Sequence, residues 1–440
     1  MKRLWLLLAL ALGPLALGSC VPQHSGKTEI VLQRFFGSCD ADYGRSTDIA
    51  RAEGECGIVT TLVNKFAADN PDVHVRVNIV FWPGYDQLTA QMAANDAPDL
   101  VTMHASVVSD YQARGLLTPI GDDLKRVGVD PADFTDAAAK SVTYGGKVYG
   151  MPFDNWAQLW HINMGLMRKA GLVRGGQPVL PRNGDELLAQ AEQFKRATGK
   201  PYLVQISANE YAAYARILYN YLIQQDSDFF ANPKHIHLQT PEAARILTLF
   251  KAIRDRGLTT VNQDYSAATA SFLNGGGGIL LNGTWMVGTF DLESKKPGSA
   301  LSAGYAVRPF PSLFGGKSIY YVDGHNWVMP TNAQRSPAQK NAALRLLKFF
   351  QSHDLDWART GHLLAYRSVT ANPAFRALPH RRDYLVLTTN GTPLPNGVRR
   401  QYPIETIIGE ECSAAINGLK PIDRALADAE HRINDLLSNV

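Results

Sequence analysis

The sequence lacks the short motifs that mark the commonest nucleotide-binding, zinc-binding and hydrolase sites. A run of four glycines occurs at 275–278 and a Gly-Lys-Ser sequence at 316–318, but neither has the spacing of a phosphate-binding loop or a dinucleotide-binding turn. His-Glu-x-x-His, Cys-x-x-Cys and Gly-x-Ser-x-Gly are all absent. His235 and His237 could chelate a metal together, but the sequence shows no third ligand beside them. We therefore expect no metal and no cofactor.

A strong excess of charge is also absent, because 44 Lys and Arg residues stand against 40 Asp and Glu residues. The densest basic cluster is the short run at 380–382, which is typical of a solvated face. This pattern argues against a nucleic-acid partner. No low-complexity tract or solenoid repeat is visible. A chain of 440 residues is long for one compact core and favours two lobes.

Long hydrophobic runs are scarce, and the clearest one lies at the N-terminus. A basic start precedes an apolar run over 4–17, which is too short for a membrane span but suits a signal peptide. The run ends in Leu-Gly-Ser-Cys, which resembles a bacterial lipobox. We expect a signal peptide over 1–19, a lipid on Cys20 and a tether over 20–27. An ordinary signal peptide beside a chance cysteine is the alternative.

Cysteine is also rare, with only four residues in the chain. If Cys20 is lipidated, three thiols remain for an oxidising compartment. Cys39 and Cys56 form the favoured disulfide because they are close in sequence, and closing that loop would stabilise the fold by about 3 kcal/mol. Cys412 would then be a lone buried thiol, although its pairing with either partner stays open.

Strand and helix patterns alternate along the chain, which favours an α/β fold with a largely parallel sheet. The segment 28–36 alternates and is rich in β-branched residues, whereas 241–256 carries apolar residues on one helical face. Strands are expected over 28–36, 73–81, 99–104, 158–163 and 202–206, and helices over 57–70, 85–95, 106–114, 164–170, 184–198, 241–256, 337–352 and 421–437, with a strand–helix unit over 278–292. The economical interpretation is two α/β lobes, each with its own sheet.

Four degenerate stretches, taken in order, indicate a family. They are APDLVTMHASVVSDYQARGLLTPI at 97–120, GGKVYGMPFDNWAQLWHIN at 145–163, GGGGILLNGTWMVG at 275–288 and VDGHNWVMPTN at 322–332. Together, behind a lipobox, they resemble the family 1 extracellular solute-binding proteins of ABC importers. This group includes maltose-, other oligosaccharide- and glycerol-phosphate-binding proteins. The resemblance covers essentially the whole mature chain.

The resemblance implies a periplasmic-binding-protein fold (type II-like) in which two lobes, joined by crossing strands, close on a ligand in the cleft between them. Residues 28–140 and 278–325 would form the first lobe, and 141–277 and 326–440 the second. The implied function is capture of a carbohydrate and its delivery to permease subunits in the membrane. The protein would be an exported, lipid-anchored monomer and not an enzyme.

The resemblance also implies that residues just after the Gly-x-Pro run line the cleft, namely Asp154, Asn155 and Trp156. Asp154 and Trp156 would share one face of an extended segment. Maltose-binding relatives place a ligand-bonding carboxylate where this sequence has Trp156, so the ligand's identity stays open. Trp285 matches the family's stacking tryptophan, because an indole can cover the apolar face of a pyranose.

The remaining candidates come from strand ends and from matching loops. Asp86 matches an acidic ligand contact in some relatives, although a charge at a helix N-terminus explains it equally well. His104 ends a strand at the edge where doubly wound folds bind ligands. Phe36 ends the first strand and could stack on a second sugar ring. The others are the loop residues Asp323, Gly324 and His325, and Tyr366 and Arg367 of the late binding loop.

Two other functions remain open at this point. A glycerophosphodiester or a polyol is an alternative ligand. A phosphate group is typically bound by arginines or by helix N-termini, and Arg367 is the only arginine among the candidates. A secreted glycoside hydrolase would need two opposed carboxylates, and the sequence shows no signature around such a pair. The aromatic candidates favour a sugar.

Overall fold

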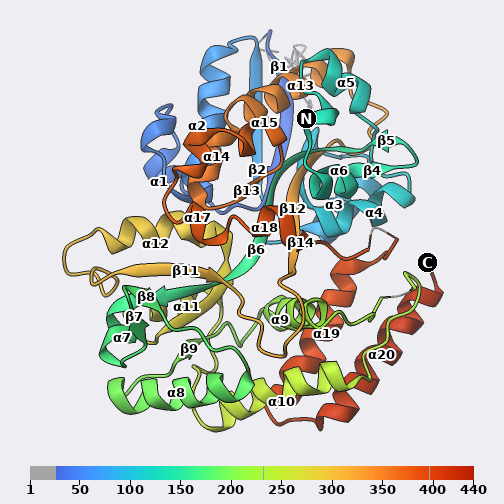
Figure 1. The fold of residues 1–440 in the computed structure, drawn as a ribbon. Helices are drawn as coiled ribbons and strands as arrows, with labels where there is room; N and C mark the ends of the chain where they lie inside the picture. The colour runs from blue at the N-terminus through green and yellow to red at the C-terminus, as the bar shows by residue number, and fades with distance from the viewer. Residues whose placement is uncertain (1–25, 231, 396) are drawn as a thin grey trace, which may run out of the picture.

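The computed structural model describes residues 26–230, 232–395 and 397–440, and Figure 1 shows two lobes, one above the other. The expected signal peptide and the lipidation at Cys20 lie outside these residues. Within the described ranges, no helix combines the length and the apolar character needed to cross a membrane.

Ten strands of the described residues form one hydrogen-bonded sheet, whose main path has the order β2-β1-β3-β12-β6-β10-β9. β11 and β13 pair with β6, and β14 pairs with β12. The strands are β1 (Thr28–Arg34), β2 (Val73–Ile79), β3 (Leu100–His104), β6 (Gly150–Asn163), β9 (Leu203–Val204), β10 (Ile279–Gly283), β11 (Tyr305–Pro309), β12 (Tyr320–Val328), β13 (Leu363–Leu364) and β14 (Gly391–Thr392). Two small hairpins stand apart, β4 (Thr143–Tyr144) with β5 (Lys147–Val148) and β7 (Val173–Arg174) with β8 (Gln177–Pro178).

Strand β6 joins the two lobes, so the expectation of two separate sheets is wrong. Residues 150–157 of β6 pair antiparallel with β12, whereas residues 158–163 pair with β10 and β11. In Figure 1 this strand runs from the upper lobe into the lower one. The sequence predicted only its second half, because β6 is buried along most of its length and shows no alternation of apolar and polar residues.

The upper lobe packs helices on β1, β2, β3 and the upper half of β6. Its helices are α1 (Asp40–Tyr43), α2 (Gly54–Asp69), α3 (Tyr85–Ala93), α4 (Ala105–Ala113), α5 (Gly121–Arg126), α6 (Asp136–Val142), α13 (Pro337–Ser352), α14 (Asp354–Trp357), α15 (Arg367–Thr370) and α16 (Pro373–Arg376). Single 3₁₀ turns lie at Ile49–Arg51, Pro131–Asp133 and Ala358–Thr360.

The lower lobe surrounds β9, β10, β11 and the lower half of β6. Its helices are α7 (Met164–Lys169), α8 (Gly184–Thr198), α9 (Ala212–Gln224), α10 (Pro241–Asp255), α11 (Tyr265–Leu273), α12 (Val287–Ser294), α19 (Gln401–Ile416) and α20 (Ile422–Ser438). A 3₁₀ turn at Thr284–Met286 precedes α12, and the short helices α17 (Arg381–Tyr384) and α18 (Leu387–Asn390) lie near the junction of the lobes.

The cores correct the expected division of the chain into lobes. Helix α13 was placed in the second lobe, but its buried face belongs to the same apolar core as β1 and α2. Strand β10 was placed in the first lobe, but it pairs with β9 and its Ile279 belongs to the core of the lower lobe. The chain therefore crosses between the lobes at other points than the resemblance implied.

Helix ends with strong local signals fall where the sequence predicts them. Helix α8 begins after Asn183, whose side chain accepts from Glu186 N, and ends before the left-handed Gly199. Helix α13 begins with a capping box between Ser336 and Gln339. Helix α9 was not predicted, because nearly every side is buried and no polar face contrasts with an apolar one.

Candidate ligand-binding site

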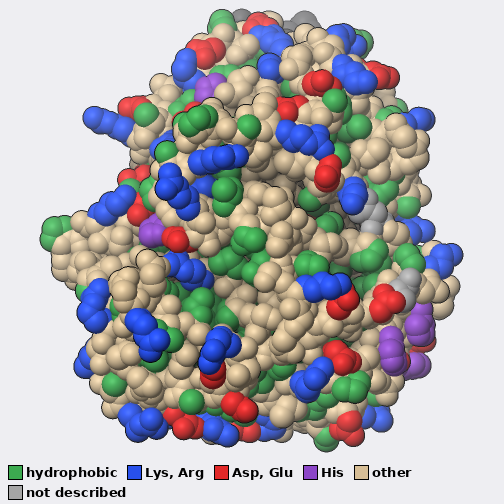
Figure 2. Space-filling model, viewed as in Figure 1, with side chains coloured by type: hydrophobic (Ala, Val, Ile, Leu, Met, Phe, Trp, Pro, Cys, Tyr) green, Lys and Arg blue, Asp and Glu red, His purple; other side chains and the backbone are tan. Residues whose placement is uncertain are grey.

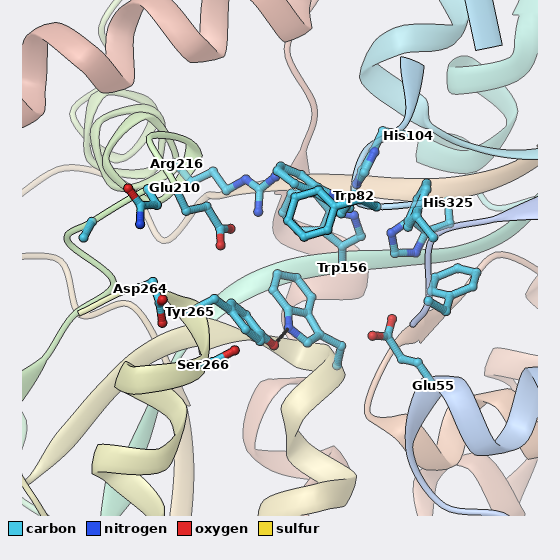
Figure 3. Close-up of a pocket in the computed structure, with 16 residues that line it drawn as sticks. Glu55, Trp82, His104, Trp156, Glu210, Arg216, Asp264, Tyr265, Ser266 and His325 are labelled. Atoms are coloured by element: carbon cyan, nitrogen blue, oxygen red, sulfur yellow. Dashed lines mark hydrogen bonds between the residues drawn. The ribbon is translucent and has the colours of Figure 1, made fainter. Parts of the chain in front are cut away.

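A cavity of about 520 Å³ lies between the lobes and combines aromatic and ionisable side chains (Figure 3). The upper lobe supplies residues that follow β1 and β2, the last residue of β3 and the start of α2. The lower lobe supplies residues around α9, α11 and β10. The aromatic lining residues are Phe35, Phe36, Phe81, Trp82, Trp156, Tyr265 and Trp285. The ionisable ones are Glu55, His104, Glu210, Arg216, Asp264 and His325.

Two aromatic walls come from different lobes and remain accessible. Phe81 and Trp82 follow β2, and Phe81 is 94% exposed. Tyr265 and Trp285, from the other lobe, are half-buried, and Trp285 Nε1 donates to the Tyr265 hydroxyl at 2.9 Å. Exposed apolar rings at the mouth of a cavity are a typical sign of a binding site.

The backbone at Gly283 sets the position of Trp285. A Cβ atom at Gly283 would lie 2.0 Å from the Trp285 ring, so only glycine allows the indole to fold back over the strand end. Trp285 also meets Trp156 edge to face, with ring centroids 5.4 Å apart. The Asn-Gly-x-Trp motif thus has a steric basis.

Trp156 reaches the cavity but is only 1% exposed. The guanidinium of Arg216 covers its ring, with Cζ 4.6 Å from the ring centroid, and lies 5.7 Å from the ring of Trp82. Arg216 Nε donates to Glu405 at 2.7 Å. Burial alone would lower the pKa of Arg216, but the nearby Glu405 and Glu210 carboxylates outweigh burial and raise that pKa.

Asp154 lies beneath the cavity floor, where it holds other side chains. It is 1% exposed, and its Oδ2 accepts from His325 Nδ1 at 2.9 Å and from Trp357 Nε1 at 2.7 Å. Burial alone would raise the pKa of Asp154, but the charges of His325 and His362 and the hydrogen bonds from His325 and Trp357 together outweigh burial and lower that pKa. Burial likewise lowers the pKa of His325, but the charge and hydrogen bond of Asp154, together with the charges of Glu55 and Asp323, outweigh burial and raise that pKa. Asp154 therefore orients His325, which faces the cavity.

Glu55 and His362 extend this floor toward α2. Oε1 of Glu55 lies 3.5 Å from Nε2 of His362, and that nitrogen lies 3.7 Å from Oδ2 of Asp154. Burial raises the pKa of Glu55 to about 8, with His325 opposing the shift, and lowers the pKa of His362 to about 3.

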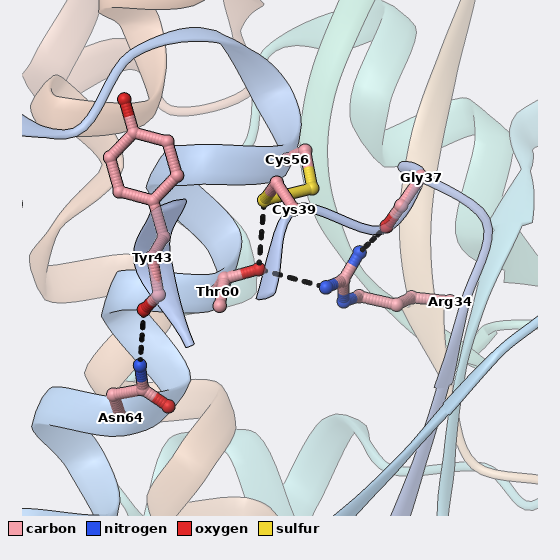
Figure 4. The surroundings of a disulfide bond; sticks show 7 residues. All are labelled: Arg34, Gly37, Cys39, Tyr43, Cys56, Thr60 and Asn64. Atoms are coloured by element: carbon pink, nitrogen blue, oxygen red, sulfur yellow. Dashed lines mark hydrogen bonds between the residues drawn. A yellow bond between two sulfur atoms is a disulfide. The ribbon is translucent and has the colours of Figure 1, made fainter. Parts of the chain in front are cut away.

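The expected disulfide lies next to Glu55 and fixes the start of α2. Cys39 and Cys56 are bonded (Figure 4). Cys412 is free and buried. Thr60, one turn further along α2, accepts from Arg34 Nη2 at 2.9 Å and lies 3.5 Å from Cys39 Sγ. Burial raises the pKa of Cys412 to about 12, so this thiol stays protonated.

The structure brings five of the predicted site residues to the cavity: Phe36, His104, Trp156, Trp285 and His325. His104 Nδ1 is 2.5 Å from the Tyr85 hydroxyl, and burial holds the His104 pKa well below its usual value. Phe36 is 7% exposed and meets the His325 ring edge to face at 5.2 Å.

Six other predicted residues do not line the cavity, in addition to Asp154. Asp86 is exposed in the first turn of α3, and Asn155 lies half-buried against Gly324. The Tyr366 hydroxyl donates to Pro152 O at 3.0 Å within the upper core, and Arg367 pairs at the surface with Asp136 at 2.6 Å. The two residues left are Asp323 and Gly324.

Asp323, Gly324 and His325 were expected in a loop, but they lie within strand β12. The Asp323 carboxylate accepts from Ser106 N at 3.0 Å and from Ser106 Oγ at 2.6 Å. This side chain therefore ties β12 to the start of α4. The loop expectation failed because Asp-Gly, which normally signals a turn, here sits in the middle of a buried crossing strand.

Several cavity residues were missed by sequence reasoning. Phe81 and Trp82 could have been found, since aromatic residues at the carboxyl end of a strand precede a Pro-Gly turn. Arg216 carried no signal, because it lies inside a helix and the tertiary fold alone turns it to the cavity. The others are Phe35, Glu55, Ala208, Asn209, Glu210, Asp264, Tyr265 and Ser266.

Charged side chains of both signs are interspersed over the face shown in Figure 2, as the balanced composition predicts. His237, from the His-x-His pair, lies 3.1 Å from Glu430 at the surface. Neither His235 nor His237 lines the cavity.

Comparison with known proteins adds family evidence. A family model described as bacterial extracellular solute-binding protein matches residues 57–355. The arabinooligosaccharide-binding protein of Bacillus subtilis (strain 168) is 23% identical over 287 residues, which cover 62% of this chain. The chain spans 62% of the length of that curated relative.

Solved structures share the fold at low sequence identity. The cyclic alpha-maltosyl-1,6-maltose binding protein from Arthrobacter globiformis superposes with a TM-score of 0.70 at 22% identity, covering 94% of this chain and 100% of that one. Maltose-bound MalE3 of T. maritima gives a TM-score of 0.76 at 19% identity, covering 93% and 100%. These likenesses show a two-lobed binding-protein fold.

Proposed function

The chain belongs to the family of bacterial extracellular solute-binding proteins, and we propose that it captures a carbohydrate between its lobes for an ABC importer. The observation that carries the proposal is one cavity in which accessible aromatic rings face hydrogen-bonding side chains. A pyranose presents an apolar face, which a ring can cover, and a rim of hydroxyls, which carboxylates can bind.

The aromatic walls and the ionisable groups suit an oligosaccharide. Phe81 and Trp82 from the upper lobe and Trp285 from the lower lobe offer separate platforms. Glu210 and Asp264 come from the lower lobe and can accept hydrogen bonds from sugar hydroxyls (Figure 3). Relatives whose names mention arabinooligosaccharide or maltose support the same ligand class.

A phosphate-bearing ligand is less favoured. Arg216 is the arginine among the lining residues that the structure describes, and it is already paired with Glu405 at 2.7 Å. Glu210 and Asp264 line the same cavity and would repel a phosphate when ionised. A hydrolase is also less favoured, because the family to which the chain belongs consists of binding proteins.

The placement of one aromatic wall on each lobe explains how a sugar could be captured between them. Each lobe supplies one aromatic wall, while β6 and β12 run continuously past the cavity floor. A sugar that contacts both walls stabilises the closed arrangement, because a ligand shifts a conformational equilibrium only by its differential contacts with the two states. Closure around the sugar would then present one shape to the permease.

Membership of an extracellular family means that the protein is exported. The basic start, the short apolar run and the Leu-Gly-Ser-Cys ending support a lipid on Cys20, with residues 20–27 as the tether. In this arrangement a monomer anchored to the membrane passes its sugar to permease subunits.

A melting screen tests the proposal, because saturating ligand raises stability by RT ln(1 + [L]/Kd). Arabino- and maltooligosaccharides should raise the melting temperature of the wild type, whereas glycerophosphodiesters should not. Phe81→Ala should weaken binding by about 1 kcal/mol, roughly fivefold. Leu419→Ala is the matched control, because Leu419 is 82% exposed and does not line the cavity.

Three results would contradict the proposal. One is stabilisation by glycerophosphodiesters alone, and a second is an equal effect of Phe81→Ala and Leu419→Ala on affinity. The third is cleavage of a labelled oligosaccharide, which would point to a hydrolase.

A further inference from the structure

We propose that Glu55, His325 and His362 bind one Zn²⁺ ion at the floor of the cavity. Their ligand atoms all lie within 4.8 Å of one another, and the Glu55 Oε1 to His362 Nε2 distance is 3.5 Å. Two ligands about 2.1 Å from a tetrahedral zinc ion lie about 3.4 Å apart, so this pair already has the required spacing. The inference concerns a metal and goes beyond capture of a sugar.

His362 has a free lone pair aimed at this site. The Thr360 hydroxyl donates its hydrogen to Trp357 O at 2.7 Å, so its oxygen accepts from His362 Nδ1, also at 2.7 Å. The proton therefore sits on Nδ1, and Nε2 is left as an unprotonated nitrogen. Nε2 has no hydrogen-bond partner, and the residue is 0% exposed.

The His362 ring is also fixed in orientation. It stacks on the Trp357 ring with centroids 5.2 Å apart, and the Trp285 ring lies 6.4 Å away in a similar plane. Burying a nitrogen that has no hydrogen-bond partner costs free energy. A ligand bound to Nε2 of this stacked imidazole would offset that cost.

His325 shows the outer support that metal-binding histidines usually have. Its Nδ1 donates to Asp154 at 2.9 Å, which leaves Nε2 for a metal. A carboxylate behind a histidine fixes the ring and makes its other nitrogen a stronger ligand. Both histidines therefore have a partner on Nδ1, Asp154 for one and Thr360 for the other.

Glu55 supplies the third ligand and can adjust its position. Its side chain is 25% exposed, so the carboxylate has room to move toward the two imidazoles. The backbone beside it is held, because Cys56 is bonded to Cys39. The site therefore combines two buried imidazoles with one partly exposed carboxylate.

The donor set selects the metal. Calcium and magnesium prefer sites made mainly of oxygen ligands. Two imidazoles and one carboxylate are the ligands of zinc sites that keep a fourth position open. Glu55 and His325 line the cavity, so the open position faces the space assigned to the ligand. A water molecule or a ligand oxygen could occupy it.

Titration calorimetry on the full-length protein, stripped with EDTA and freed of chelator, tests the site without any sugar. We expect ZnCl₂ to bind at one site and CaCl₂ not to bind. Glu55→Gln and His362→Gln should each weaken zinc binding by at least about 100-fold, because even outer-shell changes cost 10–100-fold. His237→Gln is the control, since this exposed histidine belongs to the surface pair.

Melting curves of the metal-free variants accompany the titrations. If His362→Gln unfolds the protein, Glu55→Gln decides, because the Glu55 side chain is partly exposed. Absence of single-site zinc binding would overturn the inference. Unchanged affinity in Glu55→Gln, or loss of binding in His237→Gln, would do the same. Because zinc is the probe, failure here leaves the sugar screen unaffected.

Discussion

Replacing Asp154 with alanine should destabilise the protein, whether or not a ligand is present. The carboxylate is 1% exposed and accepts from His325 N at 3.1 Å, from His325 Nδ1 at 2.9 Å and from Trp357 Nε1 at 2.7 Å. Removal leaves an indole N–H and an imidazole without their acceptor inside the protein. Breaking a buried pair of this kind costs about 3–5 kcal/mol.

Urea unfolding followed by fluorescence measures this cost as a change in the free energy of unfolding. Asp86→Ala is the matched control, because Asp86 is an exposed aspartate, and its effect should stay within about 0.5 kcal/mol. If Asp154→Ala kept wild-type stability and lost only ligand affinity, Asp154 would be a direct ligand contact. The role of Asp154 in holding His325 and Trp357 beneath the cavity would then be wrong.

Three further changes test other parts of the structure. Gly283→Ala places a methyl group 2.0 Å from the Trp285 ring, so it should cost about 1–3 kcal/mol and weaken sugar binding; unfolding and calorimetry measure both. Cys39→Ser with Cys56→Ser opens a loop of sequence separation 17 and should cost about 3 kcal/mol in urea unfolding. Burial lowers the pKa of His380, but hydrogen bonds to two aspartates outweigh it, so that pKa is raised. The stabilisation that His380 provides is therefore present below its ordinary pKa of 6.5 and is lost as the pH rises through the raised folded-state pKa. Over this rise in pH, the free energy of unfolding of the wild type should fall by on the order of 0.5 kcal/mol relative to His380→Asn. The same pH dependence of unfolding in both proteins would refute this prediction.

The Phe-Asp-Asn-Trp segment at 153–156 shows what alternation along a strand can predict. Asp154 and Trp156 do point to the same side of β6, since both lie near His325. How deeply each of these two side chains is buried could not be predicted from the alternation. Asp154 is covered by His325 and Trp357, and the Trp156 ring is covered by Arg216, because side chains from distant parts of the sequence fill the space above them.

Sequence patterns were sufficient to predict the α/β class, the family and the elements with strong local signals. Helix α8, with Asn183 before it and Gly199 after it, depends on caps and periodicity, which act over a few residues. The Cys39–Cys56 disulfide could also be predicted, because the short sequence separation keeps the two thiols close.

Long-range packing determines which lobe each later segment joins and which side chains meet at the cavity. Helix α13 packs in the same core as β1, although the two elements are far apart in the sequence. Glu55 and His362 lie next to each other and are also far apart in the sequence. Such contacts depend on how β6 and β12 cross between the lobes, and no local pattern encodes that path. A pattern of alternation fixes the face of a strand, whereas burial and partners on that face arise from packing between elements far apart in sequence.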